Sequence, residues 1–445
     1  MAYERADGLR YLFIDFNAFF AAVEQHDDPA LFGRPVAVIP LASEHTSAIA
    51  VSYEARRFGI KRGTKVRDMR ALCPSIIIRQ ARHDRYVAIH HQIMAELDRH
   101  LPLAKIYSID EAAFHLGRGE ASADAALIVA KKMRRALTEN VGPALRASIG
   151  LAQTRLLAKL AAESHKPDGL TVLAPDDLPG KLNDMPLRDI PGVGAGVAER
   201  LRRSNIHDFP GLWRLQPKHA RRIWGSVQGE RFWYALHGYE VEEPDTKKSM
   251  IGHSRVLSRD HESAQRARIV ARALLLKAAG RLRHHGFHAS CLSLSVRMRP
   301  EGRWESAERF APTQDNFDFL HSLDALWNAF LAETRADGWS NLRLGVVTIY
   351  LHSLYRADAA ALRQGDLFAD DAALRKSQAG ARLWKAVDMI NADPSGKFRR
   401  LGANASRTGP HKKHVMLAGQ QGLDLNYLGA KIAFSRVPDA ADFLY

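Results

Sequence analysis

The segment "LRYLFIDFNAFFAAVEQ", Leu9 to Gln25, decides the expected fold because it joins two different hydrophobic patterns. Its first half holds the continuous apolar run Tyr11 to Ile14, which is typical of a strand buried on both faces. Phe19 and Phe20 then begin an apolar pattern with helical spacing. A buried strand that leads directly into a helix predicts an α/β layer. Asp15 is expected at the junction between the two.

A second segment, "YSIDEAAFHL" from Tyr107 to Leu116, also reads as a buried strand, yet it carries the adjacent carboxylates Asp110 and Glu111. Burying an unpaired charge costs several kcal/mol, so a cation, a basic partner or water must compensate. In a straight strand the two side chains would point to opposite faces, because the side-chain period is two. Both can serve one site only near a bend, so we expect a hairpin or bent strand pair here.

Asp15, Asp110 and Glu111 are therefore candidates for one site at the ends of two strands. Three converging carboxylates supply the hard oxygen ligands that Mg²⁺ prefers. A pair of such ions activates a 3′-hydroxyl and stabilises a pyrophosphate leaving group in nucleotidyl transfer. The alternative is a solvent-exposed turn with routine charges, and composition and periodicity alone favour that alternative.

The hydrophobic pattern of the remaining sequence indicates where one domain ends and the next begins. The first 175 or so residues alternate strands with helices, and from about Leu182 short helices follow. A βαββαβ unit begins near Asp245, and after Leu354 the chain turns polar and Ala-rich, as a linker does. The elements expected in that unit are a strand at 251–257, a helix at 262–285, strands at 289–298 and 304–310, a helix at 315–334 and a strand at 342–351.

Composition limits the classes of function. The 445 residues are 46% hydrophobic and 25% charged, as in a globular protein, and the net charge of +15 indicates a polyanionic partner. Nucleic acid comes first and an anionic membrane surface second, with a merely solvated basic surface as the alternative. Cys73 and Cys291 are expected to be free thiols. Because "MAYERADGLR" lacks an apolar core and no run approaches the length of a membrane span, we expect a cytoplasmic protein without a membrane partner.

Four motifs stand in an informative order: "FIDFNAFFAAVE", "AVSYEARRFGIKRGTKV", "YSIDEA" and "ASIGLAQTRLLAKLAAESHKPDG". In order and spacing the chain resembles the Y-family translesion DNA polymerases over residues 10–355. The resemblance implies an α/β and α+β multidomain right hand that copies damaged templates with low fidelity. Its parts would be a ferredoxin-like palm (1–18 and 84–175), small fingers (19–83), a helical thumb with a helix-hairpin-helix (176–245), a βαββαβ little finger (249–355) and a C-terminal linker and tail (356–445).

The same resemblance assigns roles to single residues. Asp15, Asp110 and Glu111, with the backbone carbonyl of Phe16, match the ligands of two Mg²⁺ ions, for which Mn²⁺ can substitute. Phe20 matches the steric gate that excludes a ribonucleotide 2′-hydroxyl. The other residues matched to the incoming dNTP are Phe19, Ser47, Ile49, Tyr53, Arg56 and Lys166. The chemistry of these side chains agrees with binding a triphosphate, because arginine can hold a phosphate through two hydrogen bonds and lysine supplies a compact positive charge.

Primer-template DNA would be held further along the chain. "IPGVGAGVAERL" (190–201) is no dinucleotide motif, because the third glycine would fall on Val197. Pro191, Gly192 and Gly194 instead fit a helix-hairpin-helix that grips a DNA phosphate through backbone N–H groups. The basic residues expected to follow the duplex on the little finger are Arg255, Arg259, Arg297 and Arg299.

The segment "RQGDLFADD", Arg363 to Asp371, resembles the peptide that bacterial polymerases insert into the sliding clamp. Gln364, Leu367 and Phe368 have the spacing Q-x-x-L-F, and a chance match is the alternative. Asn17 and parts of the C-terminal half look UmuC-like, whereas "HKPDG" is more DinB-like. The need for a UmuD-like accessory subunit or a recombinase filament therefore stays open. The rival functions are a catalytically inactive scaffold that recruits another polymerase, and a palm-type nucleotide cyclase.

Overall fold

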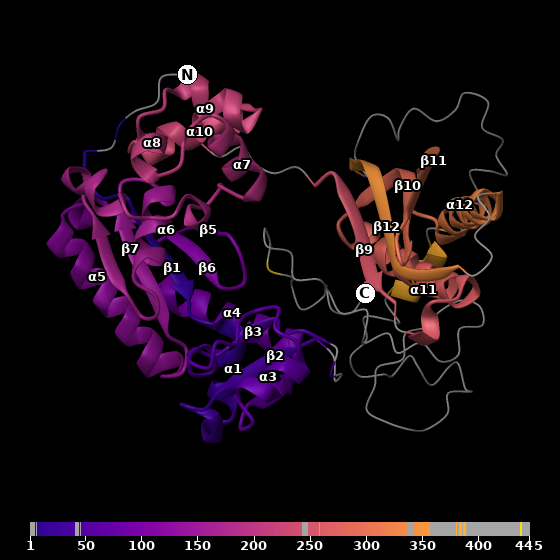
Figure 1. Cartoon of the computed structure of the whole chain (residues 1–445), viewed down its shortest axis with the longest axis horizontal. Helices are drawn as coiled ribbons and strands as arrows, with labels where there is room; N and C mark the ends of the chain where they lie inside the picture. The colour runs from indigo at the N-terminus through magenta and orange to yellow at the C-terminus, as the bar shows by residue number, and fades with distance from the viewer. Residues whose placement is uncertain are drawn as a thin grey trace. The chain divides into compact units, whose positions relative to one another are not determined.

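The structure is a computed structural model, shown in Figure 1. It describes residues 7–40, 46–242, 248–257, 259–336 and 342–356, the pieces 382–384 and 386–388, and the single residues Arg5, Glu44, Gly380 and Val437. The described residues divide into two compact units, the first up to Pro244 together with Val437 and the second from Asp245 onward. Each unit is described by itself below.

A five-stranded sheet in the order β5-β6-β1-β7-β8 forms the centre of the N-terminal unit. Its central strand β1 is buried along its whole length and pairs antiparallel with β6 and β7. The continuous apolar run of the sequence therefore marks a strand covered on both faces, as predicted. The strands are β1 (Tyr11–Phe16), β5 (Leu103–Ile106), β6 (Glu111–His115), β7 (Ala147–Ala152) and β8 (Leu170–Leu173).

The two faces of this sheet are covered by different helices. Tyr11 and Phe13 of β1 belong to the same buried cluster as helix α6 (Arg155–Ser164) and the helices that follow it. Leu12 and Ile14 alternate to the opposite face, where α4 (His83–Leu97) and α5 (Ala123–Ala136) lie (Figure 1). Asp15 alternates with Ile14, so its side chain is directed to the α6 face.

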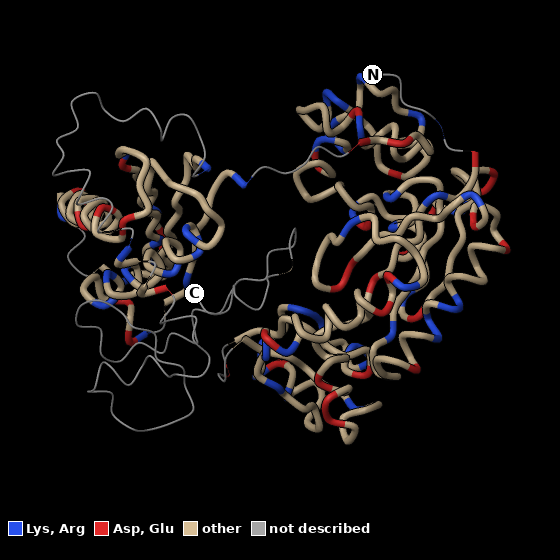
Figure 2. The backbone as a smooth tube through the Cα atoms, turned by 180° about the vertical axis from the view of Figure 1, so that it is seen from behind, with Lys and Arg blue, Asp and Glu red and all other residues tan. Residues whose placement is uncertain are grey.

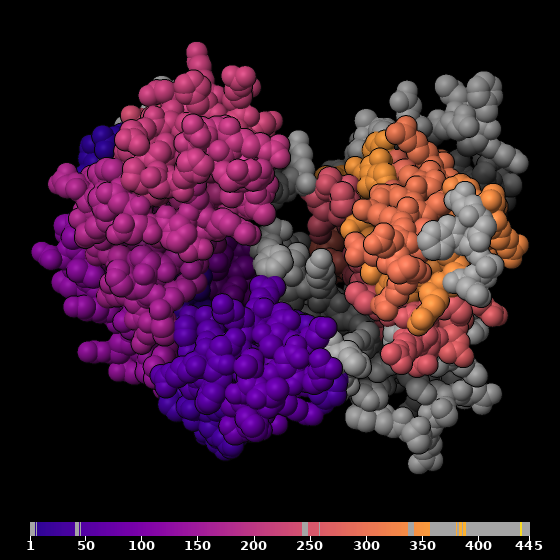
Figure 3. All heavy atoms as spheres, viewed as in Figure 1, coloured from indigo at the N-terminus to yellow at the C-terminus, as the bar shows by residue number. Residues whose placement is uncertain are grey.

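A second, three-stranded sheet in the order β3-β2-β4 packs with short helices around buried Cys73. Its elements are α1 (Phe19–Asp27), β2 (Val36–Ile39), β3 (Ala50–Val51), α2 (Tyr53–Arg56), α3 (Val66–Leu72) and β4 (Ile77–Gln80). Four helices lie at the end of the N-terminal unit opposite to this small sheet, as the space-filling view shows (Figure 3). They are α7 (Ala195–Arg203), α8 (Phe209–Trp213), α9 (Pro217–Trp224) and α10 (Val227–Leu236). The remaining single-turn helices are η1 (Pro29–Leu31), η2 (Arg118–Glu120), η3 (Leu137–Val141), η4 (Pro175–Asp177), η5 (Gly180–Leu182), η6 (Leu187–Asp189) and η7 (Arg259–His261).

The N-terminal end of α6 anchors the helices α7 to α10 to the central sheet. Thr154 caps α6 and also donates its hydroxyl hydrogen to the carbonyl of Ala235 at 2.8 Å. Beside it, the Tyr11 hydroxyl donates to Glu240 at 2.7 Å, and burial together with this contact raises the pKa of Tyr11. The last turn of α10 is thereby bonded directly to the layer that carries Asp15.

The C-terminal unit has the predicted βαββαβ order. Its antiparallel sheet, β11-β10-β12-β9, packs one face against both long helices, and buried Trp327 and Phe330 of the second helix lie in that core. The elements are β9 (Met250–Val256), α11 (Ala264–His284), β10 (Phe287–Arg299), β11 (Arg303–Thr313), α12 (Asn316–Ala336) and β12 (Arg343–Arg356).

A short segment beyond β12 also belongs to the C-terminal unit. Trp384 is 2% exposed, donates its indole N–H to Asp315 at 3.0 Å and lies 5.2 Å from the Phe317 ring. Asp388 accepts two hydrogen bonds from Arg283, at 2.6 and 2.8 Å. The expected linker and tail therefore contribute a buried anchor to this unit.

Replacing this anchor should destabilise the C-terminal unit. Trp384→Ala removes a large buried side chain and is expected to lower the free energy of unfolding by about 3 kcal/mol. Differential scanning calorimetry of the full chain measures the loss as a lower transition temperature. Leu383→Ala is the matched control, because Leu383 is 43% exposed and should change little. Equal effects of the two changes would show that Trp384 does not anchor this segment to the C-terminal unit.

Candidate active site

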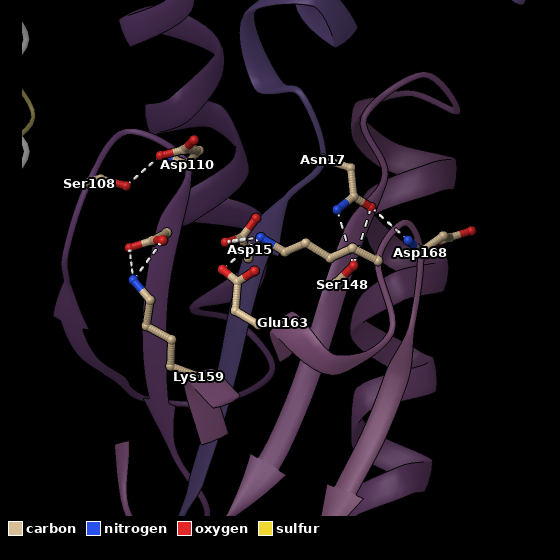
Figure 4. Close-up of polar contacts among 10 residues, drawn as sticks. Asp15, Asn17, Ser108, Asp110, Ser148, Lys159, Glu163 and Asp168 are labelled. Carbon is tan, nitrogen blue, oxygen red and sulfur yellow. Dashed lines mark hydrogen bonds and ion pairs between the residues drawn. The ribbon is translucent and has the colours of Figure 1, made fainter. Parts of the chain in front are cut away.

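Two carboxylates face each other at the ends of the central strands. Asp15 of β1 is the antiparallel partner of Glu111 at the start of β6, so the two side chains leave the sheet on the same face. One carboxylate oxygen from each of Asp15, Glu111 and Glu163, the last on α6, lies within 4.8 Å of the other two. Figure 4 shows this acidic cluster in front of the strands. The sequence had suggested Asp15 and Glu111 but not Glu163.

Two lysines lie against the cluster, Lys159 on α6 (Figure 4) and Lys166 in the turn that follows it. Lys159 donates to both Glu111 oxygens at 2.7 Å. Lys166 donates to Asp15 at 2.7 Å and to Glu163 at 2.8 Å. The basic partner required for buried carboxylates is thus present. A partial signal for it exists in the sequence, because positions 159 and 163 lie four residues apart on one face of a helix, whereas Lys166 follows in the turn after α6.

Asp110 is directed away from this cluster. Its carboxylate accepts a hydrogen bond from the Ser108 hydroxyl, and its carbonyl accepts from the Phe16 N–H at 2.8 Å. It sits in the turn between β5 and β6, so the expected hairpin is confirmed. Neighbouring side chains at a strand end alternate in direction, which explains why Asp110 and Glu111 diverge.

The electrostatics of the site favour further positive charge. Burial raises the pKa of Asp15 to about 7, against the opposing charge of Lys166. Burial also raises the pKa of Asp110, against the hydrogen bond from Ser108. Burial alone would lower the pKa of Lys166, but its ion pairs with Asp15 and Glu163 raise it overall. Three carboxylates face two lysines here, so the ionised cluster has an excess of negative charge.

A stacked aromatic pair lies on α1 and α4, beyond β1. Phe20 is half-buried and stacks on buried Tyr86, with ring centroids 4.4 Å apart. The Tyr86 hydroxyl donates to Glu24 at 2.8 Å, and Glu24 accepts two hydrogen bonds from Arg82 at 3.0 and 2.8 Å. Phe19 is 3% exposed and belongs to the core. The partly exposed ring at this position is therefore Phe20.

The other residues matched to a nucleotide lie on the small sheet and its helices. Arg56 is exposed, and its guanidinium lies 4.1 Å from the centroid of the Tyr53 ring. Ser47 and Ile49 are half-buried and flank buried Ala48 beside β3. Lys166 lies instead at the end of α6, within the cluster described above.

The residues expected to contact DNA lie in two parts of the structure, the loop before α7 and the C-terminal unit. Gly192 has φ of +91°, where an L side chain would be strained, and Gly194 is the N-cap of α7; Pro191 precedes both. This hairpin agrees with the expected helix-hairpin-helix. Figure 2 shows basic residues in both units.

The little-finger arginines are not all on one face. Arg297 and Arg299 are exposed on β10, and Arg299 pairs with Glu262 at 3.3 Å. Arg255 is half-buried on the side of β9 that also carries buried Ile251 and His253, and Arg259 lies in η7. Gln364, Leu367 and Phe368 lie outside the described residues.

Comparison with known proteins agrees with this geometry. Residues 14–163 match the impB/mucB/samB family model, and residues 248–367 match the model of that family's C-terminal domain. A DNA polymerase IV from Moorella thermoacetica is 34% identical over 388 residues, which cover 85% of this chain and 92% of the relative. Another from Halorhodospira halophila is 33% identical, covering 76% of this chain and 94% of that protein.

A solved Y-family polymerase chimera, Dbh-Dpo4(243-245)-Dbh, has the same fold with a TM-score of 0.66, at 20% identity, over 78% of this chain and 99% of its own. The chain therefore belongs to the Y family of translesion DNA polymerases, the impB/mucB/samB family. It is a DNA-directed DNA polymerase, and the predicted fold class is confirmed. Polymerases of this family depend on metal ions, and the donor set fits a hard cation because it consists of carboxylate oxygens.

Among the residues that the structure describes, no helix is long and apolar enough to cross a membrane.

Proposed function

We propose that this chain extends a primer 3′ end with deoxynucleotides on a DNA template, damaged templates included, and holds two Mg²⁺ ions at the acidic cluster. The observation that carries the proposal is the placement of Asp15 opposite Glu111 with Lys166 beside them. Asp15, Asp110, Glu111 and the Phe16 carbonyl would hold the ions. The ions would lower the pKa of the attacking hydroxyl and neutralise charge on the leaving pyrophosphate.

The chain's own side chains do the remaining work in this proposal. Lys159 holds the Glu111 carboxylate through two hydrogen bonds and so fixes its orientation. Lys166 turns from Asp15 to the triphosphate, where its charge offsets the phosphate oxygens. Arg56 and Tyr53 approach the same phosphates from α2. For Asp110 to join the ligands its side chain would have to leave Ser108.

Neutralising the carboxylates should abolish synthesis. Asp110→Asn and Glu111→Gln keep the side-chain shape but lose the charge that binds a cation, so we expect kcat to fall by at least about a hundredfold. Primer extension with Mg²⁺ measures this, and a gel-shift assay should show nearly unchanged DNA affinity. Glu139→Gln is the control, an exposed carboxylate in η3. Extension at the wild-type rate by either variant would show that the changed carboxylate is not a metal ligand.

The stacked ring of Phe20 is proposed to exclude the ribose 2′-hydroxyl. Phe20→Ala opens that space, so the preference for deoxynucleotides over ribonucleotides should fall by roughly tenfold or more. Single-nucleotide incorporation with paired dNTP and rNTP substrates gives the ratio of their kcat/KM values. Phe32→Ala, which removes a half-exposed ring elsewhere, should leave the ratio unchanged. An unchanged ratio in Phe20→Ala would mean that another residue guards the 2′ position.

We also propose that Gln364, Leu367 and Phe368 tether the polymerase to the bacterial sliding clamp. The Q-x-x-L-F spacing and its place shortly after β12 support this. Leu367 and Phe368 would fill an apolar pocket while Gln364 bonds at its rim. Such a short peptide binds weakly, on the order of micromolar, but the tether raises the local concentration at the primer end.

Replacing Leu367 and Phe368 together by Ala should abolish stimulation by a loaded clamp and leave clamp-free extension unchanged. The measurement is extension of one primed circular template with and without the clamp. Stimulation that survives the double change would place the tether elsewhere in the chain.

A further inference from the structure

The turn that carries Lys166 is bonded to the residue that follows strand β1. Asn17 Oδ1 accepts the backbone N–H of Asp168 at 2.8 Å, as Figure 4 shows. The Asn17 side-chain amide donates to Ser148 Oγ at 3.1 Å. Asn17 is 6% exposed and Ser148 is fully buried on β7. The bond to Ser148 is therefore shielded from water and the bond to Asp168 is partly shielded, which makes both determinants of position.

The turn at 165–169 is tight and has few ways to relax. Asp168 has φ of +59°, an uncommon conformation for a residue other than glycine. A Cβ atom on Gly169 would lie 1.9 Å from the His165 carbonyl oxygen. The carbonyl of Gly169 accepts from Ile149 at 2.9 Å, which fixes the turn to β7. Asn17 fixes it to the end of β1, two residues beyond Asp15.

We infer that Asn17 is a positioning residue for Lys166, which sets the affinity for the incoming nucleotide. This inference rests on the proposed role of Lys166 as a triphosphate ligand. In the structure Lys166 is held partly by its ion pair with Asp15. That pair is lost when Lys166 turns to the triphosphate, whereas the hydrogen bond from Asp168 to Asn17 stays. Asn17 thus keeps Lys166 within reach of the triphosphate after its ion pair with Asp15 is lost.

The side-chain amide suits this position for an electrostatic reason. Two separate groups have to be satisfied, a donor on Asp168 and the Ser148 hydroxyl, and an amide offers both an acceptor and a donor. It does so without adding a charge to a cluster that already has excess negative charge. A carboxylate at position 17 would still accept the Asp168 N–H and could accept from Ser148, but it would increase that excess.

The test compares KM for dNTP with kcat in the full chain under saturating primer-template and Mg²⁺. Asn17→Ala removes both hydrogen bonds, so we expect KM to rise about fivefold to tenfold with kcat changed by less than about threefold. Asn17→Asp keeps the acceptor and should return KM to within about twofold of the wild type. Ser148→Ala loosens the amide and should raise KM by an intermediate factor. The control is Asn140→Ala, which breaks a 2.8 Å bond to Glu96 in the helical layer.

A double-mutant cycle separates this inference from the role of Lys166 itself. If Asn17 acts through Lys166, Asn17→Ala should change KM by less than about twofold once Lys166 is Ala. Equal effects in both backgrounds, or no rise of KM in Asn17→Ala and Ser148→Ala, would overturn the inference. Lys166→Ala with an unchanged KM would instead overturn the proposed role of the lysine. The Mg²⁺ concentration for half-maximal rate should not move in Asn17→Ala, and a shift would show that Asn17 acts on Asp15.

Discussion

The placement of Asp15 directly opposite Glu111 is the constraint on which the rest of the N-terminal unit depends. Two carboxylates at this cross-strand distance repel each other, and burial removes the water that would weaken the repulsion. Lys159 and Lys166 supply the positive charge, and both come from α6 or the turn after it. The helix must therefore run along this face of the sheet with its C-terminal end at the strand ends.

The same helix links the acidic cluster to helices α7 to α10, the expected thumb. Its N-terminal cap, Thr154, bonds to α10, while its C-terminal end carries Glu163 and leads to Lys166. Ten residues of α-helix span about 15 Å, so one short rigid element joins the two places. Leu157 and Leu160 of α6 are buried against β1 and the thumb helices in one cluster. A shift of the thumb relative to the sheet would thus act on the lysines without a separate hinge.

Local periodicity made much of the fold predictable. The apolar run of β1, the hairpin around Asp110 and the βαββαβ order each rest on a pattern within a few residues of sequence. The missed features depend on register between distant segments. Glu163 joins the cluster only because α6 crosses β1 and β6 at one place, and Asp110 is held away from the cluster by the alternation of side chains and by its bond to Ser108. The burial of Trp384 was missed because it depends on contacts with Arg283, Asp315 and Phe317, which are distant in the sequence.

The two lysines are not equivalent, and this asymmetry bears on how a cation enters. Lys159 holds both oxygens of Glu111 and has no other ion pair among the described residues, so leaving Glu111 would strand a half-buried charge. Lys166 divides its hydrogen bonds between Asp15 and Glu163 and sits on a turn fixed independently by Asn17 and β7. It can give up Asp15 and keep a carboxylate partner. A cation would therefore displace Lys166 from Asp15, while Lys159 holds Glu111 in place throughout.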